Sequence, residues 1–382
     1  MRMTRSLVAT LGLAVLFAGP EFAQAQNTIQ LVKDNSGVGT TSAEFLLMGA
    51  GARGMALGPA FAALSRDVES LYYNPASLPL MEGAEARFTL MPYFADTNYL
   101  WAGVALPLRG GEYGFGVSIA NFGFSGQPVY TEIDQDNESQ LTYGVSETVI
   151  GLSFARAFID RFSGGFTVKM ISDQLGQTTA LGFALDIGTN YHAELAGKPI
   201  SMSFVIQNLG SGLKHAGSGL DFNSFAQSED PNFPVQGVDA SPARFEAADA
   251  PLPVAFRVGL AYDLVSSAAN RLSLLGEFNE FYNNDPSFGV ASEYEWSPAE
   301  SPLSVALRGS YAYQPDNALS TREEADFGNA ATTVTDEGLD GMTVGGGMRY
   351  RFAGYEARAD YAYRHFGVLG ARNVFTFGFG WR

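Results

Sequence analysis

The chain has 382 residues, of which 40 are acidic and 23 are Lys or Arg, so its formal net charge is −17. A protein this acidic repels the phosphate backbone, which argues against a nucleic-acid partner. Cysteine is absent, which excludes disulfides, thiolate metal sites and lipid attachment through cysteine. The three histidines, His192, His215 and His365, lie far apart in the sequence. We therefore expect neither a metal site nor another cofactor.

The first 25 residues have the layout of a secretory signal peptide. Arg2 and Arg5 precede an apolar run from Leu7 to Ala18, and Ala23, Gln24 and Ala25 form a small-x-small cleavage site. An uncleaved anchor is the alternative, but a run of about a dozen residues is shorter than the roughly 20 that a membrane-spanning helix needs. We expect residues 1–25 to be removed during export.

Residues 26–82 precede the first predicted strand and are not strand-like. The stretch 45–59 is too apolar for a solvated tail and too rich in glycine for a stable helix. A short helix is predicted over 60–71. Asn74 and Pro75 then form a turn, because a residue before proline avoids the helical region and an Asn side chain bonds to nearby backbone.

From about residue 83 onward, apolar residues recur at every second position. In 252–264, for example, Leu252, Val254 and Phe256 begin an apolar set that alternates with small or charged residues. Tilted strands of about nine to eleven residues cross a bilayer, whereas those of soluble sandwiches are shorter. The pattern predicts an all-β fold, a transmembrane antiparallel β-barrel of about fourteen strands. The predicted strands are 83–92, 98–107, 112–121, 147–156, 162–172, 179–191, 200–209, 252–264, 271–281, 287–296, 303–313, 341–352, 354–364 and 373–382.

An even number of strands returns both ends of the barrel wall to the periplasmic side. The long connections 122–146, 210–251 and 314–340 then all lie outside, while the short turns 108–111 and 157–161 lie on the periplasmic side. The three long connections carry fourteen of the seventeen net negative charges. This acidity suits a cationic partner, bridging divalent ions or simply a well solvated surface.

Charged residues within the predicted strands take the positions opposite the apolar set, because an Arg or Lys facing lipid at mid-membrane costs about 2 to 4 kcal/mol. They are Glu85, Arg87, Lys169, Asp186, Arg257, Glu277, Glu293, Arg308, Arg349, Arg351, Glu356, Arg358, Asp360 and Arg364. Arg156 and Glu280 are exceptions, and both lie at strand ends, where the cost falls. Lipid-facing aromatics gather at strand ends as well, namely Tyr191, Tyr262, Trp296, Tyr313, Tyr350 and Trp381. A large secreted β-sandwich is the alternative fold, but its strands would be shorter and its charges would not share one face.

A barrel of fourteen strands encloses a lumen too wide for side chains alone to fill. We therefore expect three parts: a signal peptide (1–25), an N-terminal plug or hatch inside the lumen (26–82) and the outer-membrane barrel (83–382). A general diffusion porin is the alternative barrel, and it would lack an apolar hatch.

The run from Phe45 to Leu64, followed by Asp67 and by 72–78, resembles the N-terminal signature of the PorV/PorQ family of outer-membrane proteins. It is also similar to the Asn-Pro-Ala hatch region of FadL-type transporters. The motif positions are Gly51, Arg53, Gly54, Met55, Gly58, Asp67, Asn74, Pro75 and Ala76. The chain departs from the family pattern at Pro59, where a second Gly is expected, and at Ser77, where a Gly is expected.

The FadL-type resemblance implies passive uptake of hydrophobic small molecules, such as long-chain fatty acids, through a barrel that its hatch blocks. An arginine in the lumen would then meet the polar end of such a ligand. Lumen candidates are Arg257, Glu277, Arg308, Arg349, Arg351 and Arg358. The alternative for each is a structural charge lattice that spaces the strands and seats the hatch.

The resemblance to PorV implies a different role, an accessory barrel of the type IX secretion system that handles secreted proteins at the cell surface. The partners implied are therefore the outer-membrane bilayer, a hydrophobic ligand and secretion-system proteins. An enzyme is the third class, but the sequence has no Gly-x-Ser-x-Gly elbow and no Ser/His/Asp set on adjacent predicted strands. We expect no catalysis.

Overall fold

The structure is a computed structural model that describes residues 39–132, 134–224, 241–313, 341–366 and 370–381. The predicted signal peptide, residues 26–38 of the predicted hatch, the connection 314–340 and residues 225–240 lie outside the described residues. No described helix is both long and apolar enough to span a membrane.

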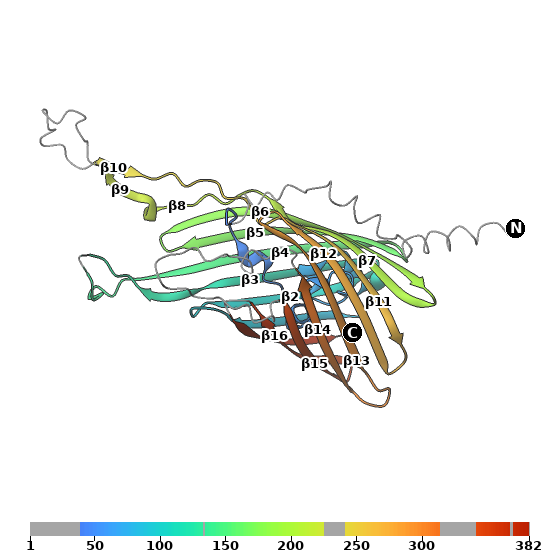
Figure 1. Ribbon diagram of the computed structural model, residues 1–382. Helices are drawn as coiled ribbons and strands as arrows, with labels where there is room; N and C mark the ends of the chain where they lie inside the picture. Colours follow the sequence, from blue (N-terminus) through green and yellow to red (C-terminus); the bar gives the residue numbers. More distant parts are fainter. Residues whose placement is uncertain (1–38, 133, 225–240, 314–340, 367–369, 382) are drawn as a thin grey trace, which may run out of the picture.

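In the described chain, fourteen antiparallel strands close into a barrel (Figure 1). Each pairs with the next one along the chain, except that β7 pairs with β11, and β1 pairs with β17 to close the wall. The strands are β1 (Ala84–Pro92), β2 (Asn98–Leu108), β3 (Tyr113–Pro128), β4 (Thr142–Ile159), β5 (Phe162–Leu175), β6 (Thr178–Leu195), β7 (Lys198–Gly210), β11 (Ala255–Ser266), β12 (Asn270–Phe281), β13 (Asn284–Trp296), β14 (Leu303–Tyr313), β15 (Met342–Phe352), β16 (Tyr355–His365) and β17 (Ala371–Trp381). The fourteen-strand prediction is confirmed.

Alternation along each strand sorts side chains between the two faces of the wall. On β17, Phe375 and Phe377 are 40% and 61% exposed, whereas Val374 and Thr376 are buried. Aromatic residues at predicted strand ends, such as Trp296 and Tyr313, also lie on the outer face. An apolar outer face of this extent is stable only when lipid covers it.

Charged strand residues face the interior, as predicted. Arg87, Glu277 and Glu293 are each less than 5% exposed. Arg156 and Glu280, the two predicted exceptions, are exposed. The parity of the charges therefore identified the lumen face correctly.

Ala84 of β1 lies opposite Trp381 of β17, so the wall begins and ends at the same end of the barrel. We call this the terminal end and the opposite one the loop end. The turn between β4 and β5, at the terminal end, is only two residues long. As predicted from the even number of strands, the first and the last strand of the wall therefore end on the same side of the membrane.

Three predicted boundaries are wrong. β3 and β4 run on through much of the connection 122–146, because strand pairing continues there without the two-sided alternation that marks a lipid-covered wall. The connection 210–251 contains β8 (Ala216–Gly217), the helix η8 (Ser218–Leu220), β9 (Asp221–Ser224) and β10 (Ser241–Arg244), and β9 pairs with β10 in a hairpin that projects from the loop end (Figure 1).

The third error is at the start of the predicted strand 252–264. β11 begins only at Ala255, and Leu252, predicted to face lipid, is buried inside with 2% exposure. Pro251 and Pro253 flank it and cannot donate to a strand ladder, so pairing starts beyond them.

Residues 39–82, the described N-terminal segment, form short helices linked by turns. They are η4 (Glu44–Leu47), α2 (Ala52–Ala56), η5 (Gly58–Ala60), α3 (Ser70–Tyr73) and η6 (Pro75–Leu80), and a further short helix, η7 (Arg109–Gly111), lies between β2 and β3. The helix predicted over 60–71 is wrong: only Ala60, at the end of η5, and the last two residues are helical. The acidic side chains of this stretch, Asp67 and Glu69, instead turn toward Arg87 of the wall.

The N-terminal segment lies within the ring of strands (blue in Figure 1). Its backbone bonds to inward side chains on opposite parts of the wall: Ala52 N donates to Thr376 Oγ1 at 2.7 Å, and Gln207 Nε2 donates to Tyr72 O at 2.5 Å. Phe61 and Leu78 are completely buried. The interior of the barrel is therefore occupied by protein over this stretch.

Candidate functional site

The N-terminal segment is tied to the wall by a buried network of arginines and carboxylates. Arg53 of α2 makes a bidentate ion pair with Glu293 of β13, with Nε–Oε2 at 2.8 Å and Nη2–Oε1 at 2.7 Å. Glu293 also accepts from Arg308 Nε at 2.6 Å, and Arg308 reaches Asp360 at 2.6 Å. One residue of the segment thus connects to β13, β14 and β16 together.

A second part of this network centres on Arg87 of β1, whose side chain is fully buried. It contacts three carboxylates: Asp67 at 3.0 Å, Glu69 at 2.5 Å and Glu85 at 2.8 Å. Asp67 Oδ2 also accepts from Arg53 at 2.5 Å, so this one oxygen joins the two halves. Each buried charge has a partner of opposite sign, which is the condition for burying charge at all.

Asp67 and Glu69 of the segment differ in the pKa of their carboxyl groups. Burial acts to raise the pKa of Asp67, but Arg87 and Arg53 together hold that pKa well below its usual range. Burial raises the pKa of Glu69 to about 8, against the opposing effect of Arg87. Glu69 Oε2 also accepts from the backbone N of Gly54 at 2.7 Å.

Three motif glycines lie where a side chain does not fit. A Cβ on Gly54 would lie 2.3 Å from the Tyr73 ring, and one on Gly51 would lie 2.0 Å from the Glu69 carboxyl. A Cβ on Gly58 would be 2.7 Å from Ser310 Oγ of β14. Gly51 and Gly58 also have positive φ values, 69° and 57°, which favour glycine. Met55, between these glycines, is 1% exposed.

Asn74, Pro75 and Ala76 form the predicted turn. Asn74 Oδ1 accepts from Ala76 N at 3.1 Å and caps η6, while its Nδ2 donates to Thr189 O of β6 at 3.2 Å. A Cβ on Gly188 would lie 2.2 Å from Asn74 Oδ1, so β6 is in close contact with this turn. All three turn residues are buried.

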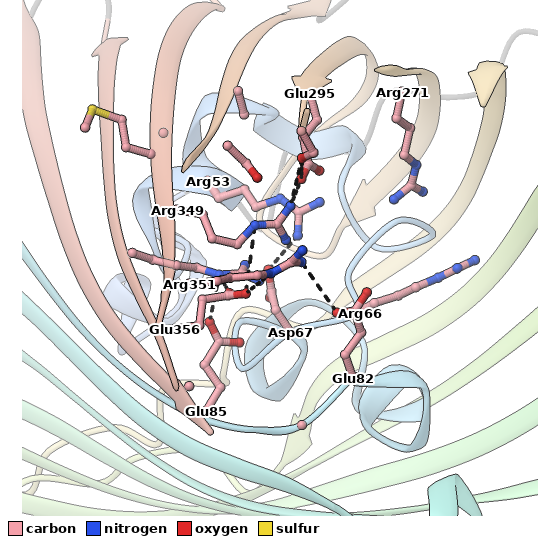
Figure 2. Close-up of a pocket in the computed structure, with 18 of the residues that line it drawn as sticks. Arg53, Arg66, Asp67, Glu82, Glu85, Arg271, Glu295, Arg349, Arg351 and Glu356 are labelled. Atoms are coloured by element: carbon pink, nitrogen blue, oxygen red, sulfur yellow. Dashed lines mark hydrogen bonds and ion pairs between the residues drawn. The ribbon is translucent and has the colours of Figure 1, made fainter. Parts of the chain in front are cut away.

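A cavity of about 570 Å³ opens beside this network at the terminal end of the barrel. Arg53, Arg66 and Asp67 of the N-terminal segment line one side of it, and arginines and glutamates from β12 to β16 line the others (Figure 2). This volume lies within the usual range for small-ligand sites, but the lining is charged. We call it the terminal cavity.

The terminal cavity contains Arg308, Arg349, Arg351 and Arg358 of the six predicted lumen candidates. Arg349 pairs with Glu295 and donates to Ser297 Oγ at 3.3 Å. Arg351 and Arg358 both pair with Glu356, and Arg351 is 42% exposed. These ion pairs are the contacts expected of a structural charge lattice, the alternative to ligand binding for each lumen candidate.

The other two candidates, Arg257 and Glu277, lie elsewhere. Arg257 stacks on the Tyr72 ring, with its guanidinium carbon 5.9 Å from the ring centroid. Glu277 Oε2 accepts from Ala62 N at 3.0 Å and so holds the backbone of the N-terminal segment. The structure therefore separates these two residues from the other four.

An apolar pocket lies between the N-terminal segment and β2 to β5. Its lining residues are Phe45, Leu46, Leu71, Tyr72, Tyr99, Trp101, Ser118, Ala120, Val149, Gly151 and Lys169. Its volume of about 20 Å³ holds no more than about one water molecule. Lys169, its one charged residue, pairs with Asp186 at 2.6 Å and donates to Asn208 Oδ1 at 2.8 Å.

Sequence reasoning missed Tyr99 and Trp101 as interior residues, although both are at most 3% exposed. β2 is apolar on both faces, so alternation did not mark an inward side there. Their inward direction could have been inferred from Gly103 and Ala105, because all four residues share one face of β2. These two small residues lie beside the buried Leu71.

The barrel is similar to solved hydrocarbon channels. It matches the CymD monoaromatic hydrocarbon channel with a TM-score of 0.53 and 12% identity, over 88% of this chain and 98% of that one. It also matches the toluene transporter TodX of Pseudomonas putida with a TM-score of 0.50 and 11% identity, over 87% and 98% of the two chains. A FadL homologue of Pseudomonas aeruginosa matches at 0.46 and 11%, over 86% and 96%.

The fold is that of a FadL-like barrel. The chain is thus an outer-membrane protein that crosses the bilayer with many strands, as its apolar outer face requires. No protein-family model matches the chain, and no curated protein does. The PorV/PorQ part of the resemblance, the signal peptide and the hatch role stay predictions.

Within the described residues, no group of three or more His, Asp or Glu side chains is placed to hold a metal ion. Of the matched proteins, CymD is a channel and TodX is a transporter. The barrel therefore contains two cavities. The charged terminal cavity lies at the terminal end, and the apolar pocket lies on another side of the N-terminal segment, against β2 to β5.

Proposed function

We propose that this barrel takes up hydrophobic small molecules passively across the outer membrane, with residues 39–82 acting as a hatch. The fold of hydrocarbon channels supports this proposal. The observation that carries it is the apolar pocket. The lumen of an aqueous porin is polar, whereas Phe45, Leu71 and Trp101 place apolar side chains inside this barrel.

The pocket is too small for a substrate in its present form, so passage requires the hatch to move. Phe45 and Leu46 belong to η4, a single short turn without side-chain capping. Displacing η4 together with α2, which follows it along the chain, would enlarge the pocket against Tyr99 and Trp101, which remain on the wall. The polar end of an amphiphile such as a fatty acid would then leave past the terminal cavity, where Arg349 and Arg351 are the proposed contacts.

In this proposal the motif residues seat the hatch. Arg53 and Asp67 hold it by charge, Asn74, Pro75 and Ala76 hold it against β6, and Gly51, Gly54, Met55 and Gly58 allow its close packing. Arg257, Glu277, Arg308 and Arg358 serve the same lattice from the wall.

A disulfide lock tests the need for hatch movement. An ideal Cβ on Gly345 of β15 would lie 2.6 Å from Cβ of Ala56, about 1 Å closer than a disulfide requires, and 2.5 Å from the backbone O of Tyr361 on β16, so the bond requires both α2 and the wall to shift. Ala56→Cys with Gly345→Cys adds the only two cysteines of the chain. We expect the oxidised protein to lose uptake of a hydrophobic tracer in proteoliposomes and the reduced protein to regain it.

Each single cysteine variant is the control, because it carries the same substitution without a cross-link. Uptake that persists in the fully oxidised protein would overturn hatch movement through α2. Absence of uptake in both oxidised and reduced protein, with single variants active, would point to damage by the paired substitutions, and Ala52→Cys with Thr376→Cys then repeats the test at a second contact.

The type IX accessory role remains the alternative from the sequence resemblance, and no contact among the described residues favours it. Mass spectrometry of the barrel purified in mild detergent separates the two. A bound lipid or hydrocarbon supports transport, whereas a secreted protein or a large translocon subunit supports the accessory role.

A further inference from the structure

Two arginines face each other across the last two strands at the loop end of the barrel. Arg364 of β16 and Arg372 of β17 are register partners, and both take the inward parity of their strands. Like charges directly opposite on a sheet repel each other. Among the described residues, neither has a carboxylate within ion-pair distance, unlike Arg53, Arg87 and Arg308.

Their remaining contacts leave donors unused. Arg364 Nη1 donates to Met48 O of the hatch at 3.1 Å, and Arg372 Nη1 donates to the adjacent Ala371 O at 2.8 Å. Arg372 Nε has no hydrogen-bond partner in the described part of the chain. A guanidinium has five N–H donors in a planar fork, so each arginine can still accept a bidentate partner.

Two aromatic rings contact the pair, and a third packs on one of them. The Phe366 ring is 4.6 Å from the Arg364 guanidinium carbon, and the Tyr93 ring is 5.9 Å from that of Arg372. Tyr93 meets both Phe366 and Phe122 edge to face, at 5.3 and 5.8 Å between centroids. All five side chains are half-buried, so each keeps an accessible face. We call them the arginine–aromatic cluster.

We propose that the arginine–aromatic cluster binds a carboxylate carried on an aromatic ring, a ligand of the benzoate class. One anion between Arg364 and Arg372 removes their repulsion, and a planar carboxylate matches the guanidinium fork. The ring of the ligand packs against Tyr93, Phe122 and Phe366, as aromatic pairs do. The inference rests on the proposed uptake function and specifies a substrate class for it.

The position of the cluster makes it a capture site. It lies where β16 and β17 meet the loop end, and Arg364 contacts the hatch backbone three residues from Phe45 of the apolar pocket. The chain carries 17 net negative charges, so an anion is repelled by the protein as a whole and is attracted only where cations are unpaired. Arg364 and Arg372, which have no carboxylate partner in the described part of the chain, therefore favour a carboxylate ligand.

The experiment compares benzoate with toluene, which has nearly the same shape and no charge. Binding of benzoate to the purified full-length barrel in detergent is measured by calorimetry for the wild type, Arg364→Gln and Arg372→Gln. Arg156→Gln, an exposed arginine at the terminal end, is the matched control. We expect each cluster variant to bind benzoate about tenfold more weakly, because each loses a hydrogen bond to a charged group.

Arg364→Lys keeps the charge but not the fork, and we expect it to lie between the wild type and Arg364→Gln. Toluene uptake into proteoliposomes is measured on the wild type and on Arg156→Gln, which should not differ. A retained β-sheet circular dichroism spectrum shows that the cluster variants fold. Benzoate binding that is absent in the wild type, or equal in all variants, overturns the inference. If the wild type does not take up toluene at all, the proposed function is overturned instead, so the two failures are distinguishable.

Discussion

Arg53 in the N-terminal segment and Glu293 on β13 lie 240 positions apart in sequence and form a buried bidentate ion pair, with N–O distances of 2.7 and 2.8 Å. Removing one partner of such a pair leaves an uncompensated buried charge, which costs about 3 kcal/mol or more. We expect Arg53→Gln to lower the free energy of unfolding by about 3 kcal/mol, measured by urea titration in detergent.

Glu293→Gln tests the same contact from the wall, and Arg53→Gln with Glu293→Gln completes a double-mutant cycle. The double variant should be less destabilised than the sum of the two single variants. Additive effects would mean that the pair contributes no coupling energy. Arg156→Gln, whose pairing partner Glu112 is solvent-exposed, should change stability by less than about 1 kcal/mol.

Gly54→Ala should destabilise the seat of the hatch. A methyl group there would lie 2.3 Å from the Tyr73 ring, so Tyr73 or α2 has to shift, at a cost of about 1 to 3 kcal/mol. The expected readout is faster proteolysis within the hatch and a higher single-channel conductance. Gly276→Ala on β12 is the control, because its nearest atom would be 4.0 Å away, and equal effects of the two changes would contradict the packing argument.

Glu69 should make the stability of the barrel depend on pH. Its pKa is raised from 4.5 to about 8 by burial, so the folded protein holds a proton that the unfolded chain releases. Stability should therefore be highest below about pH 4.5 with respect to this group and fall as pH rises toward 8. The slope is at most about 1.4 kcal/mol per pH unit.

The measurement is the urea midpoint between pH 5 and pH 9. Glu69→Gln mimics the protonated side chain, and the difference between wild type and variant should grow with pH in favour of the variant. A constant difference across this range would show that Glu69 remains ionised beside Arg87 in the folded protein.

The wall of the barrel was predictable because lipid imposes a two-residue period on it. Every one of the fourteen strands was located from that period, and Glu277 and Arg308 were assigned to the lumen by parity alone. Outside the bilayer both faces of a strand meet water, so apolar and polar residues need not alternate there. The outer parts of β3 and β4 and the β9–β10 hairpin were missed for this reason.

The N-terminal segment was less predictable, because its conformation depends on partners far away in sequence. Arg87 draws Asp67 and Glu69 into contact, so the stretch 60–71 follows the wall and not its own helix propensity. The opposition of Arg364 and Arg372 requires the register between β16 and β17, which alternation does not supply.

A charge on the outer face tests the membrane assignment itself. Leu307, in the middle of β14, is 63% exposed and faces outward. Leu307→Arg should reduce folding stability in lipid bilayers by about 2 to 4 kcal/mol, whereas Tyr313→Arg, at the end of the same strand, should cost about 1 kcal/mol or less. The measurement is reversible unfolding in lipid vesicles. In water an exposed Arg would cost neither position anything, so equal and small effects at Leu307 and Tyr313 would mean that solvent and not lipid covers this face.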